Sequence, residues 1–273
     1  MSLLLVSKLI VTTGVVLALS AVAERVSPRI AGVLSGYPLG AAIALFFMGV
    51  EIGPDFAARS AVYTQVGLVA LLVFVYVYFR VSSALPHRGI LLSSGAALSA
   101  YFAASGLLHA IPFSATAAAL LPLAAIVAFM FLFRRVQNVS IARSVRLTWA
   151  VLTLRAGLAA LMIIVVTGAA RVVGPAWAGL FAAFPIALFP LMLIVHITYD
   201  KRHVHTIIKN FPLGLGSLIS YTISVSLLYP RVGVGWGTLL SFGVATLYLL
   251  VYGAALQQAR RRRSGAKSDP AEI

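Results

Sequence analysis

The sequence predicts an all-α, polytopic transmembrane helix bundle of about nine spans. Of the 273 residues, 61% are hydrophobic and only 10% are charged, and the mean hydropathy is +1.03. Soluble domains carry roughly 25% charged residues, so this composition excludes a water-soluble fold. The apolar runs are long and show little alternation, which also excludes an outer-membrane barrel. We therefore expect one unit embedded in the lipid bilayer.

Hydropathy divides the chain into spans of about 20 residues, the length that a helix needs to cross a bilayer. The expected spans are residues 3–22, 30–50, 60–79, 89–110, 114–133, 148–169, 176–197, 206–229 and 234–256. The first span resembles a secretory signal peptide. It is also part of an internal repeat, and we therefore expect it to be retained.

The basic residues predict the orientation in the membrane. With the N-terminus outside, the cytoplasmic side holds 16 of the 21 basic residues, and the outside holds Arg59, Arg171 and Arg231. Cytoplasmic loops are enriched in Lys and Arg, so we expect a multi-pass protein of the bacterial inner membrane with a cytoplasmic C-terminus. The net charge of +15 is thus a topology signal and does not indicate a nucleic-acid partner.

An internal repeat appears when the chain is offset against itself by 147 residues. Segment 28–38, PRIAGVLSGYP, then lies over segment 175–185, PAWAGLFAAFP, and the coinciding pairs are Pro28 and Pro175, Ala31 and Ala178, Gly32 and Gly179, and Pro38 and Pro185. The same offset places Lys8 on Arg155, the two basic residues that fall inside expected spans. Together these matches predict a duplication.

The repeat unit holds four spans, and a fifth span lies between the copies, so the copies are expected to have opposite orientations. The predicted organisation is a first four-helix repeat at 1–111, a linker helix and basic cytoplasmic loop at 112–146, an inverted four-helix repeat at 147–257 and a disordered basic tail at 258–273. Two inverted repeats joined by a central helix are typical of many secondary transporters.

Lys8 and Arg155 are the first candidate functional residues. A charge near the centre of a bilayer costs a few kcal/mol or more, so a charge inside a span usually has a function. Each residue lies only a few positions from the start of its span, where a long side chain can instead snorkel to the headgroups. As a functional pair, the two residues predict a substrate-binding site for an anion.

The motifs AG-x4-YP and AG-x4-FP are the second candidate. Pro removes a backbone donor and Gly permits opening of the helix, so each motif predicts a discontinuous helix of the kind that binds substrates at mid-membrane. The alternative is a kinked helix that only packs against its neighbours. The substrate-binding residues predicted here are Ser35, Tyr37, Pro38, Phe184 and Pro185.

The repeat unit resembles the small GlpM-type integral membrane proteins. The second copy carries the resemblance in Arg155, in the AGL and FP motifs that include Leu180, and in the late His196. In the first copy, Val33 replaces Leu180 and Gly49 stands where His196 would be. The resemblance implies two such units fused in one chain, and it informs the architecture more than the substrate.

Enzyme chemistry finds little support in the remaining residues. The chain has no Cys and only six acidic residues, which excludes thiol catalysis, cysteine zinc sites and most carboxylate-rich metal sites. Hydrolase, metalloprotease and nucleotide-binding motifs are absent. We therefore expect no catalytic residue, metal or cofactor. Glu51, directly after FFMGV, is the best intramembrane acid, although it falls at a span end.

These observations predict an inner-membrane secondary transporter or permease. It would move a small anionic or zwitterionic substrate, such as a lipid headgroup, by alternating access between the repeats. The alternative is a non-transporting integral subunit of an assembly for envelope polysaccharide or lipid synthesis, because a bundle with few intramembrane polar groups needs only to pack. Small-residue faces such as SSGAALSA permit a homodimer.

Overall fold

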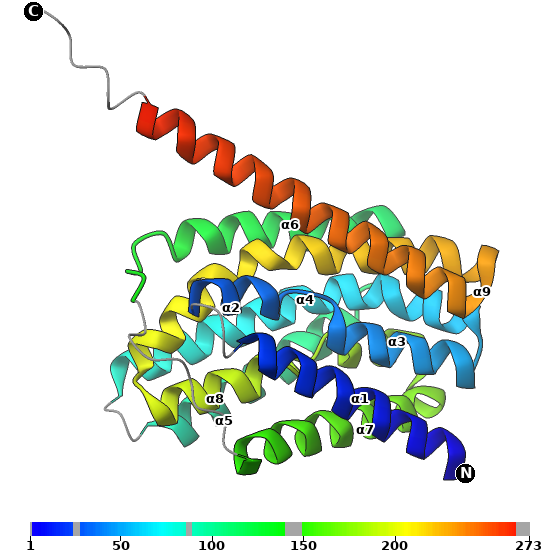
Figure 1. Ribbon diagram of the computed structural model, residues 1–273. Helices are drawn as coiled ribbons and strands as arrows, with labels where there is room; N and C mark the ends of the chain where they lie inside the picture. Colours follow the sequence, from blue (N-terminus) through cyan, green and yellow to red (C-terminus); the bar gives the residue numbers. More distant parts are fainter. Residues whose placement is uncertain (1, 24–27, 86–88, 140–148, 266–273) are drawn as a thin grey trace, which may run out of the picture.

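The computed structural model describes residues 2–23, 28–85, 89–139 and 149–265, and these residues are all-helical (Figure 1). The helices are α1 (Ser2–Ala23), α2 (Pro28–Ser35), α3 (Leu39–Glu51), α4 (Pro54–Ala84), α5 (Ile90–His109), α6 (Ala115–Leu132), α7 (Trp149–Ala182), α8 (Leu188–Thr198) and α9 (Lys201–Gly265). The predicted helical class is confirmed.

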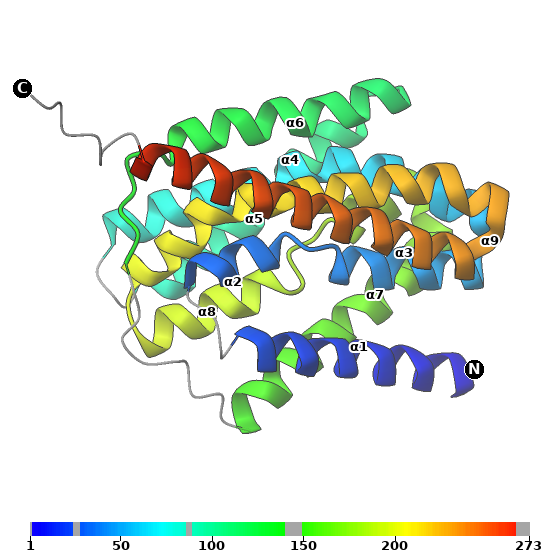
Figure 2. The ribbon, with the colours of Figure 1, turned by 45° about the horizontal axis from the view of Figure 1, so that its top comes forward.

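Two of these helices are each divided by a glycine. Gly174 in α7 and Gly233 in α9 have φ values of 77° and 78°, a conformation that side-chain-bearing residues rarely adopt. At Gly233 the chain reverses, and α9 becomes a hairpin of residues 201–232 and 234–265 (Figures 1 and 2). The Tyr229 hydroxyl lies 2.6 Å from Thr238 Oγ1 across this hairpin.

Six helices of the described chain are long and apolar enough to cross a membrane. They are Gly32–Glu51, Pro54–Ala84, Ile90–His109, Ala115–Leu132, Ala156–Ala182 and Lys201–Ala255. The protein therefore has the character of a multi-pass membrane protein. The sequence predicted about nine spans, and length and composition select only six. The α9 hairpin is counted once, the expected span 176–197 is divided between α7 and α8, and the apolar part of α1 counts as the shorter segment Leu5–Val15.

The interior of the bundle is formed around α4 and the first part of α9. Helix α4 packs against α5, α6, α7 and α9, and 61% of its most apolar window is buried. The corresponding share of α6 is 17%, and α6 lies along one edge of the bundle (Figure 2). An apolar helix with so little protein around it needs lipid against its outer face.

Local sequence explains several of the helix ends. Helix α4 begins with Pro54 directly after Gly53, whose φ of 138° turns the chain. Helix α6 begins after Ser114, whose Oγ accepts a hydrogen bond of 3.2 Å from the Ala117 amide. Helix α3 follows Pro38, which cannot donate a hydrogen bond to the preceding turn.

The helix pattern recurs after 147 residues. Helix α2 spans Pro28–Ser35, and the segment of α7 beyond Gly174 spans residues 175–182. Glu51 and Thr198 end α3 and α8, and Pro54 and Lys201 begin α4 and α9. Each of these pairs is 147 residues apart, so the offset found in the sequence also relates the helix boundaries.

Candidate functional site

The AG-x4-YP motif interrupts a helix, as the sequence predicted. Helices α2 and α3 are separated by Gly36–Pro38, where Tyr37 N–H donates to the Leu34 carbonyl at 3.0 Å. Leu39 N–H then donates to the Tyr37 carbonyl at 2.8 Å, which closes a three-residue turn around Pro38. The break therefore satisfies part of its backbone internally, as a polar backbone inside a membrane must.

The second motif breaks its helix with the same hydrogen bonds. Phe184 N–H donates to the Phe181 carbonyl at 3.0 Å, and Ile186 N–H donates to the Phe184 carbonyl at 2.7 Å. Each donor and acceptor lies 147 residues after its counterpart in the first break. The two motifs thus fold into equivalent turns between α2 and α3 and between α7 and α8.

Each broken helix lies against the long helix of the other half. Gly32 of α2 faces α9, and a Cβ atom there would lie 2.6 Å from the Ile207 carbonyl oxygen. Gly179 of α7 faces α4, where a Cβ atom would overlap the Ser60 carbonyl oxygen. Ser60 and Ile207 are themselves 147 residues apart, so the two contacts are reciprocal.

A second pair of close contacts follows the same rule. Gly36 abuts the backbone of Gly214, and a Cβ atom at Gly67 would lie 2.6 Å from the Cβ of Ala183. Gly36 and Ala183 are equivalent at the 147-residue offset, as are Gly67 and Gly214. Glycine is required at these crossings because the helix backbones approach too closely for side chains.

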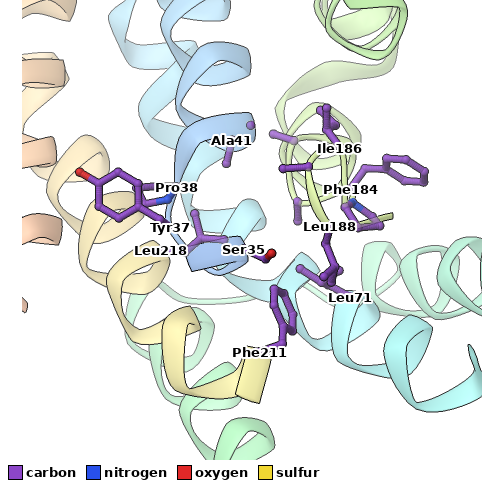
Figure 3. A pocket seen from close by; sticks show the side chains of 15 residues that line it. Ser35, Tyr37, Pro38, Ala41, Leu71, Phe184, Ile186, Leu188, Phe211 and Leu218 are labelled. Carbon is purple, nitrogen blue, oxygen red and sulfur yellow. The ribbon is translucent and has the colours of Figure 1, made fainter. Parts of the chain in front are cut away.

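The two breaks face one another across a small cavity. Its volume is about 30 Å³, which accommodates on the order of one or two water molecules. The first break contributes Ser35, Tyr37 and Pro38, and the second contributes Phe184 and Pro185 (Figure 3). The structure therefore brings together five of the seven residues that the sequence singled out for substrate binding.

Tyr37 and Phe184, the two aromatic residues of the motifs, border this cavity, and their rings point away from its centre (Figure 3). The Tyr37 hydroxyl lies 2.8 Å from Thr246 Oγ1 in the second part of α9. The Phe184 ring lies 5.3 Å from the ring of Tyr101 in α5. Their side chains anchor the breaks to neighbouring helices, while Ser35 presents its hydroxyl between the breaks (Figure 3).

Lys8 lies apart from the cavity and is already paired. Its Nζ lies 2.6 Å from Glu51 Oε1 and donates a hydrogen bond of 2.6 Å to Thr167 Oγ1. The side chains of Lys8 and Glu51 are only 9% and 18% exposed. Lys8 is therefore a neutralised cation in this structure. The side chain of Arg155, the other predicted cation, lies outside the described residues.

Glu51 is the residue whose role the sequence reasoning missed. It ends α3 and joins helices from both halves, because Lys8 belongs to α1 and Thr167 belongs to α7. Arg171 of α7 donates to the backbone carbonyl of Glu51. The only signal in the sequence was a carboxylate directly after an apolar run, and that signal did not reveal a partner 43 residues earlier in the chain.

Two histidines form contacts near the junction of α4, α8 and α9. His196 Nδ1 lies 2.8 Å from the Tyr78 hydroxyl, and His205 Nε2 lies 2.9 Å from Ser82 Oγ. His196 is buried and ties α8 to α4. Within the described ranges, no group of three His, Cys, Asp or Glu side chains is placed to hold a metal.

Comparisons with protein-family models, with curated proteins and with solved structures found no match for the chain.

Proposed function

We propose that this protein is a secondary transporter of the bacterial inner membrane that moves a small zwitterionic or anionic substrate by alternating access. The observation that carries the proposal is the pair of equivalent helix breaks that face one cavity. In many secondary transporters, discontinuous helices from two repeats bind the substrate in this way.

The proposal treats the chain as two inverted four-helix repeats with nine passes. The first repeat consists of α1, α2 with α3, α4 and α5. The second consists of the first part of α7, the second part of α7 together with α8, and the two arms of the α9 hairpin. Helix α6 connects the two repeats. Support comes from α1 and the first part of α7, which pack together and run in opposite directions (Figures 1 and 2).

The substrate class follows from the helix ends around the cavity. Helices α3 and α8 begin there, and α2 and the second part of α7 end there. A helix start carries partial positive charge and a helix end carries partial negative charge, so each break offers both signs. Such a site suits a small zwitterion better than an ion with one net charge.

A cavity of about 30 Å³ is too small for a substrate of this class, so transport requires a second state in which the breaks lie further apart. Opening would require one repeat to rock against the other around the breaks. The glycine contacts of α2 with α9 and of α7 with α4 are the surfaces on which such a movement would occur.

A ligand screen on a cavity-filling variant tests the proposal. Gly40 lines the cavity, and a Cβ atom there would make an ordinary contact at 3.5 Å from the Ile186 Cβ, so Gly40→Val adds volume without a backbone clash. Gly95→Val is the matched control, because Gly95 also lies in a helix and a Cβ atom there would have no neighbouring atom within 4 Å. The purified proteins are melted with amino acids, betaines, carboxylates, phosphate and soluble headgroup analogues.

We expect at least one zwitterionic or anionic compound to raise the Tm of the native and Gly95→Val proteins in a concentration-dependent manner. Gly40→Val should lose this shift while retaining its own Tm without ligand. The same compound should exchange across vesicles that contain the native protein. Equal Tm shifts in all three proteins would place binding elsewhere and contradict the proposal.

One observation favours the alternative, a non-transporting subunit of an envelope-synthesis assembly. The interior cation that the structure describes is neutralised by Glu51, and a bundle that only packs needs no open pathway. In that case no compound would shift the Tm of the native protein.

A further inference from the structure

We propose that an anionic phospholipid binds where α4 and α6 end, with its headgroup phosphate held by Arg80 and Arg134 and its acyl chains along the outer face of α6. This surface is separate from the cavity between the breaks, so the inference goes beyond the transport function proposed above.

Arg80 and Arg134 lie on neighbouring helices at the same end of the bundle. Arg80 follows Phe79 in α4 and Arg134 follows Phe133 after α6, and the rings of Phe79 and Phe133 lie 5.4 Å apart. The ring of Tyr76, one turn before Arg80, lies 6.4 Å from that of Phe133. Arg80 is therefore on the side of α4 that faces α6, and both arginines are exposed.

This end of the bundle, where α4 and α6 end and α9 begins, is strongly positive (Figure 1). The described chain has one acidic residue here, Asp200, and six basic residues, Arg80, Arg134, Arg135, Lys201, Arg202 and Lys209. Lys201 and Lys209 donate to backbone carbonyls, and Arg202 Nε lies 4.0 Å from the carboxylate of Asp200. In the part of the chain that the structure describes, the other three cations make no ion pair, so their guanidinium groups remain for an external anion.

An apolar stripe of α6 runs from these arginines into the membrane. Leu123, Val127 and Phe131 are exposed at intervals of four residues, so they lie on one face of the helix. The Arg134 Cζ atom lies 3.7 Å from the centre of the Phe131 ring, which places the charge at the end of the stripe. Cations beside an apolar face suit an anionic amphiphile better than a free anion.

The chain that carries Arg134 is fixed to α9. Asn210 Nδ2 donates to Asn138 Oδ1 at 3.0 Å, and the Val139 amide donates to Thr206 Oγ1 at 2.9 Å. The backbone next to the arginine is therefore already ordered, so less conformational entropy is lost when a ligand binds.

A lipid at this site would complete the surroundings of α6. Protein buries 17% of its most apolar window, and α6 connects the two repeats of the proposed architecture. Arginine binds phosphate through paired N–H donors and is less strongly hydrated than lysine, so it suits a phosphodiester at the boundary of lipid and water. Phosphatidylglycerol, with one negative charge, is the simplest lipid of this class.

The absence of native Cys allows a fluorophore to be attached to one introduced thiol. Val127→Cys places it on the stripe of α6, and Leu239→Cys places it on the second arm of α9, at positions that are 67% and 63% exposed. The full chain is placed in phosphatidylcholine vesicles that contain a small, fixed fraction of either phosphatidylglycerol or phosphatidylcholine with a nitroxide on its acyl chain. The nitroxide quenches the fluorophore on contact, so the ratio of the two quenching efficiencies measures the preference for the anionic lipid.

We expect the anionic probe to quench at Val127→Cys about twice as strongly as the neutral probe, and both probes to quench equally at Leu239→Cys. Adding Arg80→Gln/Arg134→Gln should remove the preference at Val127→Cys. Equal quenching in the protein that retains both arginines would overturn the proposal, and so would a preference that survives their removal.

Two charge controls separate a site from a diffuse attraction. Arg59→Gln/Arg231→Gln removes two exposed arginines from the opposite end, and Arg202→Gln removes an exposed arginine from the same end. Neither change should alter the preference at Val127→Cys. A preference lost in either control would indicate a diffuse attraction and overturn the proposal.

Inorganic phosphate distinguishes the lipid from a free anion. It should lower the preference no more than sodium chloride of the same ionic strength does, and displacement by phosphate alone would overturn the assignment to a lipid. Should the double variant fail to fold, Arg80→Gln and Arg134→Gln are measured singly. Each should lower the preference, and two unchanged values would contradict the site. The quenching needs no substrate, so its outcome is independent of the transport proposal.

Discussion

The two halves of the molecule share a backbone and differ in chemistry. Their helix breaks form the same turns, and their glycine contacts recur at an offset of 147 residues. The ends of the equivalent helices differ, since α3 ends in a buried ion pair at Glu51 and α8 ends in a neutral Thr198. His196 of α8 is hydrogen-bonded to Tyr78, and the residue equivalent to His196 in the first half is Gly49.

This difference shows which features the architecture demands and which it leaves open. Gly32 and Gly179 recur where backbones cross, and Pro38 and Pro185 recur where helices break, whereas Gly36 corresponds to Ala183. The polar residues at the helix ends do not recur, so each end of the bundle is closed by its own contact. The first end is held by Lys8 and Glu51, and the opposite end is held by His196 and Tyr78.

Breaking the ion pair should have the largest effect. Lys8→Met leaves the mostly buried Glu51 carboxylate without its counterion, and we expect a loss of about 3 kcal/mol of unfolding free energy. The double variant Lys8→Met/Glu51→Gln removes both charges and should recover most of this loss. Equilibrium unfolding in mixed micelles measures both. A double variant less stable than Lys8→Met would show that the pair does not act as a unit.

Substitution of a glycine at the helix crossings that both halves share should have the second-largest effect. Gly179→Ala places a Cβ atom against the Ser60 carbonyl, and we expect a loss of about 2 kcal/mol from this overpacking. Gly168→Ala on the same helix has open space around its Cβ and should be neutral or slightly stabilising. The Tm values of the two variants test this expectation. Equal values would mean that α7 and α4 do not cross closely at Gly179.

The turn that folds α9 back on itself should be sensitive to its backbone conformation. Gly233 has a φ of 78°, so Gly233→Ala is expected to cost about 1.5 kcal/mol. Gly235→Ala, two residues later in helical conformation with open space, provides the matched control and should not destabilise. Thermal unfolding compares the two, and a harmless Gly233→Ala would argue against the hairpin.

The contact at the opposite end should have the smallest effect of the four. Tyr78→Phe removes the hydroxyl that meets His196 Nδ1 at 2.8 Å, and we expect a loss of about 1 kcal/mol. Tyr37→Phe, which removes a more exposed bond to Thr246, should cost less. Chemical unfolding of both variants would test this ranking, and the reverse order would show that the His196 contact does not help to close its end of the bundle.

The positions of the helix breaks were predictable from the sequence because their causes are local. Pro38 and Pro185 each end a helical turn, and the glycines at the same spacing mark the crossings. The sequence also divided the α9 region into spans 206–229 and 234–256, and the turn at Gly233 falls between them, whereas helix length and composition count α9 once.

The functional residues were only partly predictable. Ser35, Pro38 and Pro185 line one cavity, as the repeated motifs suggested. The orientation of the Tyr37 and Phe184 rings away from that cavity depends on α9 and α5, which are distant in the sequence. Side-chain direction is set by such packing partners and not by the motif itself.

The sequence by itself determined that the chain is a helical membrane protein and where two of its helices break. Composition and proline placement act over a few residues, and a linear pattern records them. Only the tertiary structure decided that Lys8 is paired, because its partners are Glu51 and Thr167, the latter 159 residues away. An ion pair needs its groups within about 4 Å, and that proximity arises only when three helices pack together.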